Sequence, residues 1–303
     1  MNFLYLLENI RIPILNEFML AITYLGDEIA FLVVALVIFW CCDKRSGYYI
    51  LAVGFLGTIM NQFMKLWFRI PRPWVLDEQF TILEQAREGA SGYSFPSGHT
   101  QSSVGTFGGI ACITKNKLIR WVCIFVVIIV PFSRMYLGVH TPLDVTVAAA
   151  MAALLIILLK PIVFSKNSRV FPAFLGIMVA VSAAFLCFVE LYSFPADIDP
   201  HNMESGLKNA YTLLGSLLGL VVVYIVDEKY LHFTTKAVWW AQVVKVIAGL
   251  GLVLLVKSGL RVPLEAVFGL LVGRAVRYFL IVIMAGMVWP LTFQWFAKLG
   301  NKE

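Results

Sequence analysis

The chemistry of this chain is concentrated in a few polar side chains that interrupt an apolar sequence. They fall in three short stretches and comprise Lys65, Arg72, His99, Arg134, His140 and Asp144. Three cations suit a tetrahedral phosphate group, which arginine binds through a two-pronged contact. Two histidines beside one phosphate can divide the work, since one can attack phosphorus while the other protonates the departing oxygen. These residue types therefore predict a phosphate site that can cleave a phosphate ester.

The immediate neighbours of these side chains also suit an anion. Gly98 follows Ser97 where a new helix should begin, and the free N–H groups at a helix start attract phosphate. Asp144 lies four residues after His140, a spacing at which a carboxylate can orient the ring and stabilise its positive charge.

Each stretch also has a purely structural alternative. Lys65 and Arg72 could be interfacial charges at the end of a membrane span. Ser97 could serve only as the N-cap of a helix, and Asp144 could cap the next helix together with Thr141. The presence of all three stretches in one chain favours the phosphate site.

The elements that position these residues must be membrane helices. Of the 303 residues, 60% are hydrophobic and only 14% are charged, too few charges for the surface of a soluble protein of this size. Four segments of nearly spanning length contain no Asp, Glu, Lys or Arg: 46–64, 170–189, 209–226 and 278–297. We therefore predict an all-α fold, a polytopic membrane helix bundle.

About nine transmembrane helices are expected. The predicted spans are 27–42, 46–68, 98–114, 117–133, 142–164, 170–191, 207–226, 237–257 and 276–297. The segment 1–26 mixes apolar and charged residues without the features of a signal peptide, so we predict an amphipathic helix in the membrane interface.

The loop charges predict an orientation for this bundle. Lysine and arginine concentrate in every alternate loop, which places those loops in the cytoplasm, the N-terminus outside and the C-terminus inside. The loop 69–97 and the turn 133–141, which carry most of the chemistry, then lie together on the extracytoplasmic side.

Other candidate sites are weaker. The five cysteines lie in or beside apolar runs, and their spacing indicates neither a disulfide framework nor a metal site. The loop 192–206 contains Asp197, Asp199, His201 and Glu204, but a solvated acidic loop is favoured over a metal site. The net charge of +6 is spread over short loops, so we expect no nucleic-acid partner.

The three stretches match, in order, the signatures of the type 2 phosphatidic acid phosphatase (lipid phosphate phosphatase) family. The matching residues are Lys65 with Arg72 and Pro73, then Pro96, Ser97, Gly98 and His99, then Ser133 and Arg134 with His140 and Asp144. The resemblance covers about residues 27–165 and implies a metal-independent phosphatase with a phosphohistidine intermediate and no cofactor. It implies that His140 is the nucleophile, that Asp144 orients it and that His99 is the general acid. It also assigns phosphate binding to Lys65, Arg72, Ser97, Gly98 and Arg134.

The C-terminal part resembles two branches of that family. The stretch 206–219 is similar to glucose-6-phosphatases, and the stretch 277–290 is similar to sphingosine-1-phosphate phosphatases. We accordingly predict an interfacial segment 1–26, a phosphatase core 27–165 and a transmembrane extension 166–303 packed on the core. Four charged residues of the extension either line a substrate entrance or form internal salt bridges: Lys245, Glu265, Arg274 and Arg277.

The expected substrate is a lipid phosphate or diphosphate that slides from the bilayer with its head group toward the cationic site. Two alternatives stay open: a phosphatase for a soluble sugar phosphate, and a non-catalytic protein that binds or transports phosphate lipids. Expected partners are the lipid substrate and bilayer lipids, and the sequence leaves the oligomeric state open. The tail 298–303 lacks a recognised retrieval signal, which favours a bacterial plasma membrane.

Overall fold

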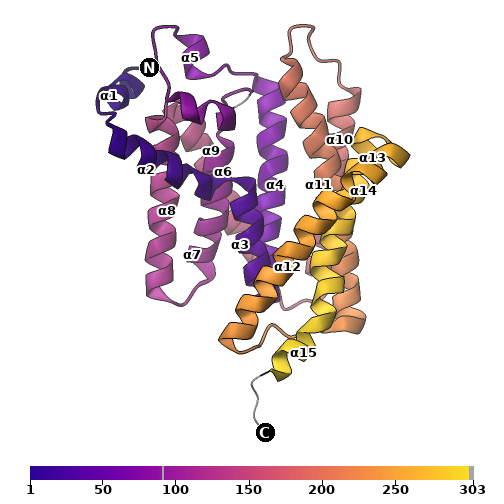
Figure 1. Cartoon of the computed structure of the whole chain (residues 1–303). Helices are drawn as coiled ribbons and strands as arrows, with labels where there is room; N and C mark the ends of the chain where they lie inside the picture. The colour runs from indigo at the N-terminus through magenta and orange to yellow at the C-terminus, as the bar shows by residue number, and fades with distance from the viewer. Residues whose placement is uncertain (91, 300–303) are drawn as a thin grey trace. The chain divides into compact units, whose positions relative to one another are not determined.

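The computed structural model describes residues 1–90 and 92–299 (Figure 1). These residues form α-helices, short 3-10 turns and π-helical segments joined by loops, and no strand occurs among them. The all-α prediction is confirmed. Most of the C-terminal tail on which the retrieval-signal argument rests lies outside the described residues.

Seven helices of the described part are long and apolar enough to cross a membrane. They comprise Lys44–Leu76, Lys117–Tyr136, Pro142–Val163, Val170–Leu191, Pro200–Leu231, Trp239–Phe268 and Leu270–Lys298. An eighth candidate is the pair Pro13–Gly26 and Glu28–Cys41, whose two halves meet at a bend of 54°. The polytopic bundle is confirmed, with seven or eight candidate spans against the nine expected.

The difference in span number arises mainly at the helix that carries His99. It consists of α6 (Gly98–Ser103), a π segment (Val104–Gly108) and α7 (Gly109–Ile113). Together these pieces are shorter than the ~20 residues that a hydrocarbon core requires. This length leaves the segment outside the candidate spans, although α6 and α7 both pack against the candidate span α8. A crossing at 98–114 stays a prediction.

The chain divides into two compact units that interleave along the sequence. The first contains residues 1–34, 49–161 and 193–206, and the second contains residues 35–48, 162–192 and 207–303. The N-terminal segment belongs to the same compact unit as His99 and His140. The division at residues 27 and 166 stays a prediction.

The N-terminal segment packs against the helix that carries Arg134. It forms α1 (Asn2–Asn9), α2 (Pro13–Thr23) and a 3-10 turn (Tyr24–Gly26), and both helices contact α8 (Lys117–Tyr136). Figure 1 shows α2 lying across α8. A location of this segment in the membrane interface stays a prediction.

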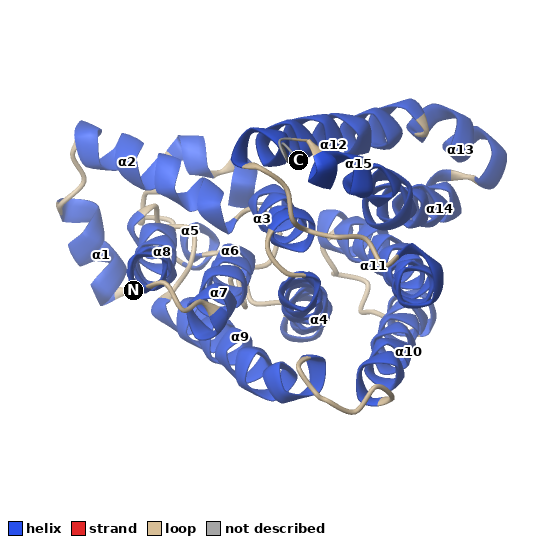
Figure 2. Cartoon of the chain, turned by 90° about the horizontal axis from the view of Figure 1, so that it is seen from below, coloured by secondary structure: helices blue, strands red, loops and turns tan. Residues whose placement is uncertain are grey.

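The rest of the first unit frames the site. α3 (Glu28–Cys41) and α4 (Lys44–Phe68) each begin or end in this unit, α5 (Pro73–Leu76) lies in the loop after α4, and α9 (Pro142–Val163) follows α8. α6 and α7 both contact α8, and Figure 2 shows these helices end-on.

The second unit contains the remaining helices. They are α10 (Val170–Leu191), α11 (Pro200–Val226), α12 (Trp239–Gly259), α13 (Arg261–Phe268), α14 (Leu270–Ile283) and α15 (Phe293–Lys298). α13 turns back onto α14 at Gly269, whose φ of 76° is a conformation that favours glycine. The predicted packing of this extension on the core stays a prediction.

Candidate active site

All eight site residues predicted from the sequence belong to the first compact unit. Lys65 lies in the last turn of α4, and Arg134 lies in the last turn of α8. Ser97 and Gly98 begin α6, and Asp144 lies in the first turn of α9. Helix ends therefore supply most of the polar groups, as expected where an apolar span meets a polar region.

His140 is contacted on both ring nitrogens by residues of the predicted set. A terminal nitrogen of Arg72 lies 2.9 Å from Nε2 of His140, and Asp144 Oδ2 lies 3.5 Å from Nδ1. Because guanidinium only donates hydrogen bonds, Nε2 must present its lone pair, and the neutral ring then carries its proton on Nδ1, facing Asp144. This tautomer leaves the lone pair on Nε2.

Asp144 combines both roles considered from the sequence. Its Oδ2 accepts hydrogen bonds from Thr141 N at 2.7 Å and from Ser94 Oγ at 2.5 Å, and its own N–H donates to Thr141 Oγ1 at 3.3 Å. The reciprocal bonds to Thr141 form a capping box for α9. The same carboxylate faces His140, so the cap fixes its position beside the ring.

The surroundings of His140 favour the neutral ring. The side chain is buried, and it lies in the turn between α8 and α9. Burial, together with the nearby charges of Arg72, Arg134 and Lys65, lowers the pKa of His140 well below its ordinary value. The free site therefore holds a histidine with an available lone pair at neutral pH.

Arg72 is held by backbone oxygens as well as by His140. Its Nε donates to Gly92 O, and a terminal nitrogen donates to Val139 O, each at 2.9 Å. The side chain is buried, so these contacts fix the guanidinium between the loop 69–97 and the turn that holds His140.

Lys65 is positioned by residues that sequence motifs did not indicate. Its Nζ donates to Tyr93 O at 2.5 Å. Tyr93 N donates in turn to Asn202 Oδ1 at 2.8 Å, and Asp199 N donates to Tyr93 Oη at 3.1 Å. Asp199 also accepts from the backbone N–H of His201, so the acidic loop acts here as a helix start and a support for Tyr93.

Gly92 permits this support. Its φ is 75°, and a Cβ there would lie 2.3 Å from Asn202 Oδ1. A side chain at this position would therefore displace the amide that holds Tyr93. Asn202 is more than 100 residues away in sequence, which is why no local pattern could have predicted its role.

Arg134 lies buried at the end of α8. A terminal nitrogen donates to Thr23 Oγ1 at 2.9 Å. Its Nε has no hydrogen-bond partner among the described residues, although this atom is buried. A buried guanidinium N–H without a partner is costly, so this group is suited to an anionic ligand.

The start of α6 behaves as a capped helix end. Ser97 Oγ accepts from Thr100 N at 3.4 Å and from Thr100 Oγ1 at 3.0 Å, so Ser97 is an N-cap. A Cβ at Gly98 would meet only Asn61 Oδ1, at 3.8 Å, so the backbone is uncrowded there.

His99 has a carboxylate partner that sequence reasoning missed. Its Nε2 lies 2.7 Å from Oδ1 of Asp27, which precedes α3. The only sequence signal was an acidic residue at a helix start, which ordinarily indicates a cap.

The four charged residues singled out in the extension have internal partners. Arg277 and Glu265 approach to 3.5 Å, and Arg274 donates to Thr212 Oγ1 at 2.7 Å. Lys245 is buried and donates to Trp40 O at 2.8 Å. The Arg277–Glu265 pair is an internal salt bridge, the alternative that the sequence left to an entrance, whereas Lys245 and Arg274 make hydrogen bonds to uncharged groups.

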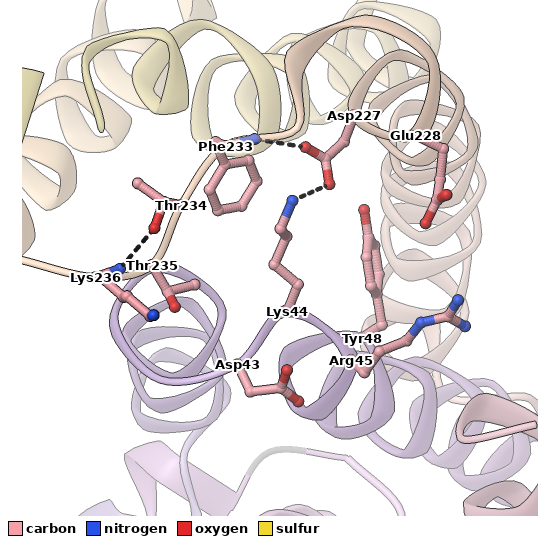
Figure 3. Close-up of a pocket in the computed structure, with 10 residues that line it drawn as sticks. All are labelled: Asp43, Lys44, Arg45, Tyr48, Asp227, Glu228, Phe233, Thr234, Thr235 and Lys236. Carbon is pink, nitrogen blue, oxygen red and sulfur yellow. Dashed lines mark hydrogen bonds and ion pairs between the residues drawn. The ribbon is translucent and has the colours of Figure 1, made fainter. Parts of the chain in front are cut away.

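The second unit also contains a pocket of about 360 Å³, shown in Figure 3. Lys44 lies at its centre, 2.6 Å from Asp227 Oδ2 and 4.0 Å from the ring centroid of Phe233. Asp227 also accepts from Phe233 N at 3.2 Å. These contacts connect the start of α4 to the residues that follow α11, so the Lys44–Asp227 ion pair stabilises the pocket.

Two family models match the chain. One, described as the PAP2 superfamily, matches residues 45–168, and this range contains every predicted site residue. The other, described as the PAP2 superfamily phosphatase transmembrane extension, matches residues 211–302. The family resemblance inferred from the three motifs is confirmed, and the C-terminal part matches a membrane extension of the same superfamily.

Three characterised proteins are similar to the chain. Undecaprenyl-diphosphatase BcrC of Bacillus subtilis is 25% identical over 161 residues, covering 52% of this chain and 78% of that protein. Phosphatidylglycerophosphatase B of Bacillus subtilis is 32% identical over 165 residues, covering 50% and 76%. An undecaprenyl-diphosphatase of Sulfolobus acidocaldarius is 26% identical over 137 residues, covering 45% and 64%. No solved structure matches the chain.

Proposed function

The chain belongs to the PAP2 superfamily, and on this premise we propose that it removes phosphate from a membrane lipid at the extracytoplasmic face, through a phosphohistidine and without a metal. Its relatives are named for lipid diphosphate and lipid phosphate substrates, which supports a lipid phosphatase. The observation that carries the mechanism is the contact sequence from Arg72 to His140 to Asp144.

In the first step, Nε2 of His140 attacks phosphorus and the bond to the leaving oxygen breaks. The ring becomes positive, and Asp144 stabilises that charge across Nδ1. His99 gives a proton to the leaving oxygen, so the lipid product departs as a neutral hydroxyl or a protonated phosphate. The low pKa of His140 suits this step, because a protonated ring has no lone pair with which to attack.

In the second step, water attacks phosphorus of the phosphohistidine. His99, now neutral, accepts a proton from that water, the N–P bond breaks and inorganic phosphate leaves. Both histidines then return to their starting protonation states, so the cycle is balanced without any cofactor.

The phosphoryl oxygens would be held by Lys65, Arg72 and Arg134, with Ser97 and the backbone of Gly98 at the start of α6. The unpartnered Nε–H of Arg134 supports this assignment. Arg72 would exchange its contact with Nε2 for a phosphate oxygen, which frees the lone pair as the substrate arrives. These donors stabilise the negative charge that moves during transfer.

The lipid would enter from the bilayer, since a site at the ends of membrane helices lies close to the level of phosphate head groups. The distribution of loop charges supports a level outside the cytoplasm, with the N-terminus outside and the C-terminus inside. A bacterial plasma membrane is part of the same proposal. The face is tested with Gln79→Cys, in a variant whose exposed native cysteines are replaced by serine. An impermeant maleimide should label intact cells, and labelling only after lysis would reverse the orientation.

The function is tested by phosphate release from the detergent-purified protein in EDTA. The panel contains phosphatidic acid, an isoprenoid diphosphate, sphingosine-1-phosphate and glucose-6-phosphate. We expect release from the lipids, a loss of at least about 10³-fold in His140→Ala, and full activity in the matched control His201→Ala. Full activity in His140→Ala would exclude the phosphohistidine, and a preference for glucose-6-phosphate would favour a soluble substrate.

A further inference from the structure

We propose that Asp27 is a positioning residue for the general acid, and that its carboxylate fixes His99 so that the transferable proton is carried on Nδ1. The inference rests on the proposed function and extends it to a residue outside the three motifs. Asp27 Oδ1 lies 2.7 Å from Nε2 of His99, a charge-assisted contact between the start of α3 and the start of α6.

The backbone beside Asp27 is fitted closely to His99. A Cβ at Gly26 would lie 2.8 Å from His99 O and 2.9 Å from His99 Cβ, which is closer than real atoms approach. Only glycine therefore lets the chain come near enough for the next residue to reach the ring. Gly26 therefore allows the contact with His99 because it lacks a side chain, and Asp27 supplies the carboxylate.

The surroundings of His99 explain why its contact with Asp27 matters. Burial, together with the positive charges of Arg134 and Arg72, lowers the pKa of His99 to about 4 and so opposes a positive charge on the ring. A general acid must nevertheless be protonated when the leaving oxygen departs. Asp27 supplies a negative charge at the one ring nitrogen that it contacts, which favours the cationic ring.

The geometry also assigns the two ring nitrogens. Nε2–H is retained by Asp27 throughout, so Nδ1–H is the proton that moves to the leaving oxygen as the P–O bond breaks. In the second step Nδ1 takes a proton from the attacking water, and the cationic ring is restored. The side chains of His99 and Asp27 are 19% and 36% exposed, so the pair keeps access to solvent protons.

A competing explanation is that Asp27 only caps α3. Its backbone is extended, and its carbonyl accepts from Phe31 N at 3.1 Å, as in an N-cap. The two roles are separable because asparagine caps a helix about as well as aspartate but carries no charge. Asp27→Asn therefore keeps the cap and removes the proposed contribution to His99.

The test compares two leaving groups in the purified protein. Dodecyl phosphate releases a basic alkoxide that needs a proton, whereas 4-nitrophenyl phosphate releases a stable phenolate that does not. We expect kcat of Asp27→Asn to fall on the order of 10²-fold on dodecyl phosphate and by less than about threefold on 4-nitrophenyl phosphate. Asp27→Glu should recover part of the loss, and Glu28→Gln, which removes the neighbouring charge of the same helix, should match the wild type.

The outcomes separate this inference from the proposed function. Equal losses of Asp27→Asn on both substrates, or a lowered melting temperature that explains the loss, would reduce Asp27 to a structural role and overturn the inference. Full activity of Asp27→Asn on dodecyl phosphate, with His140→Ala inactive, would overturn the inference and leave the phosphohistidine mechanism in place. Full activity of His140→Ala would overturn both.

Discussion

At the scale of single residues, the contacts of His140 and His99 distinguish the two nitrogens of each ring. Arg72 contacts Nε2 of His140 and thereby requires its lone pair, while Asp144 faces Nδ1 and favours a proton there. Asp27 makes a comparable contact with Nε2 of His99. Under the proposed mechanism the two histidines present opposite nitrogens to the reaction, and a carboxylate favours each choice.

Asp144→Asn tests this assignment at the nucleophile. An asparagine oxygen can still accept from Thr141 N and cap α9, but its amide cannot stabilise a positive ring and favours the other tautomer. We expect kcat to fall by about 10³-fold with an unchanged melting temperature. Phosphate release and thermal unfolding in the same detergent measure the two effects, and an active variant would restrict Asp144 to capping.

The lowered pKa of His140 predicts how the activity depends on pH. A pKa below the ordinary value of about 6.5 means that the ring stays neutral, and the enzyme active, until the pH falls past that lower pKa. Lys65→Met removes one of the charges that lower the pKa, so it should move the titration of His140 upward. NMR titration of the four histidines, with His140→Ala to assign the signal, tests this, and an ordinary pKa in the wild type would contradict it.

The sequence motifs identified the residues of the proposed active site but not the residues that hold them in place. His140, His99 and the three cations lie in motifs whose spacing can be read directly. Ser94 donates to Asp144, and Asp27 contacts His99, each across a long stretch of chain, so no local spacing reveals them. Contacts of this kind follow from packing, which a single sequence does not specify.

At the scale of elements, helix starts and helix ends supply the polar groups and loops supply their supports. The loop 69–97 is fixed from the far side by the start of α11, through the contact of Asn202 with Tyr93. Tyr93 O in turn accepts from Lys65. A helix outside the predicted catalytic core therefore helps to place a cation within it.

Asn202→Ala measures this support. Losing one buried hydrogen bond costs about 1 kcal/mol, and Tyr93 should then hold Lys65 less firmly. We expect KM to rise by about 10-fold and kcat to change less, because in the proposed mechanism Lys65 binds phosphate and does not react. Asn209→Ala on the same helix is the control, and a loss confined to kcat would contradict the positioning role.

Helices were predictable where a long apolar run alone determined the structure. Long apolar runs predicted the span Val170–Leu191 almost to its observed bounds. The helix predicted at 98–114 agrees with the helical segment 98–113 to one residue, but the prediction gave neither its π segment nor the bend between α2 and α3. Hydropathy responds to composition and is insensitive to the breaks that tertiary contacts stabilise.

At the scale of the whole molecule, the predicted site residues and the pocket around Lys44 belong to different compact units. Every predicted site residue belongs to the first unit, whereas Lys44, Asp227 and the pocket belong to the second. The interleaving of the units could not be read from the sequence, since composition changes little along the chain.

Asp227→Ala tests this separation. Lys44 would lose the carboxylate that neutralises it, and because Lys44 is 26% exposed we expect a destabilisation of only about 2 kcal/mol. The melting temperature should fall while kcat of the folded protein stays unchanged. Glu228→Ala, which removes an exposed acid of the same pocket, is the control, and a large change in kcat would show that the pocket affects the chemistry.

The contact between Arg72 and His140 has a consequence for selectivity within a bilayer. A ligand must compete with the imidazole for the guanidinium before the nucleophile is exposed. A terminal phosphoryl group, with two negative charges, competes well, whereas the singly charged phosphodiester of an ordinary phospholipid competes poorly. The resting enzyme can thus be surrounded by phosphodiesters at very high local concentration and leave them intact, because the wrong head group does not uncover the reactive nitrogen.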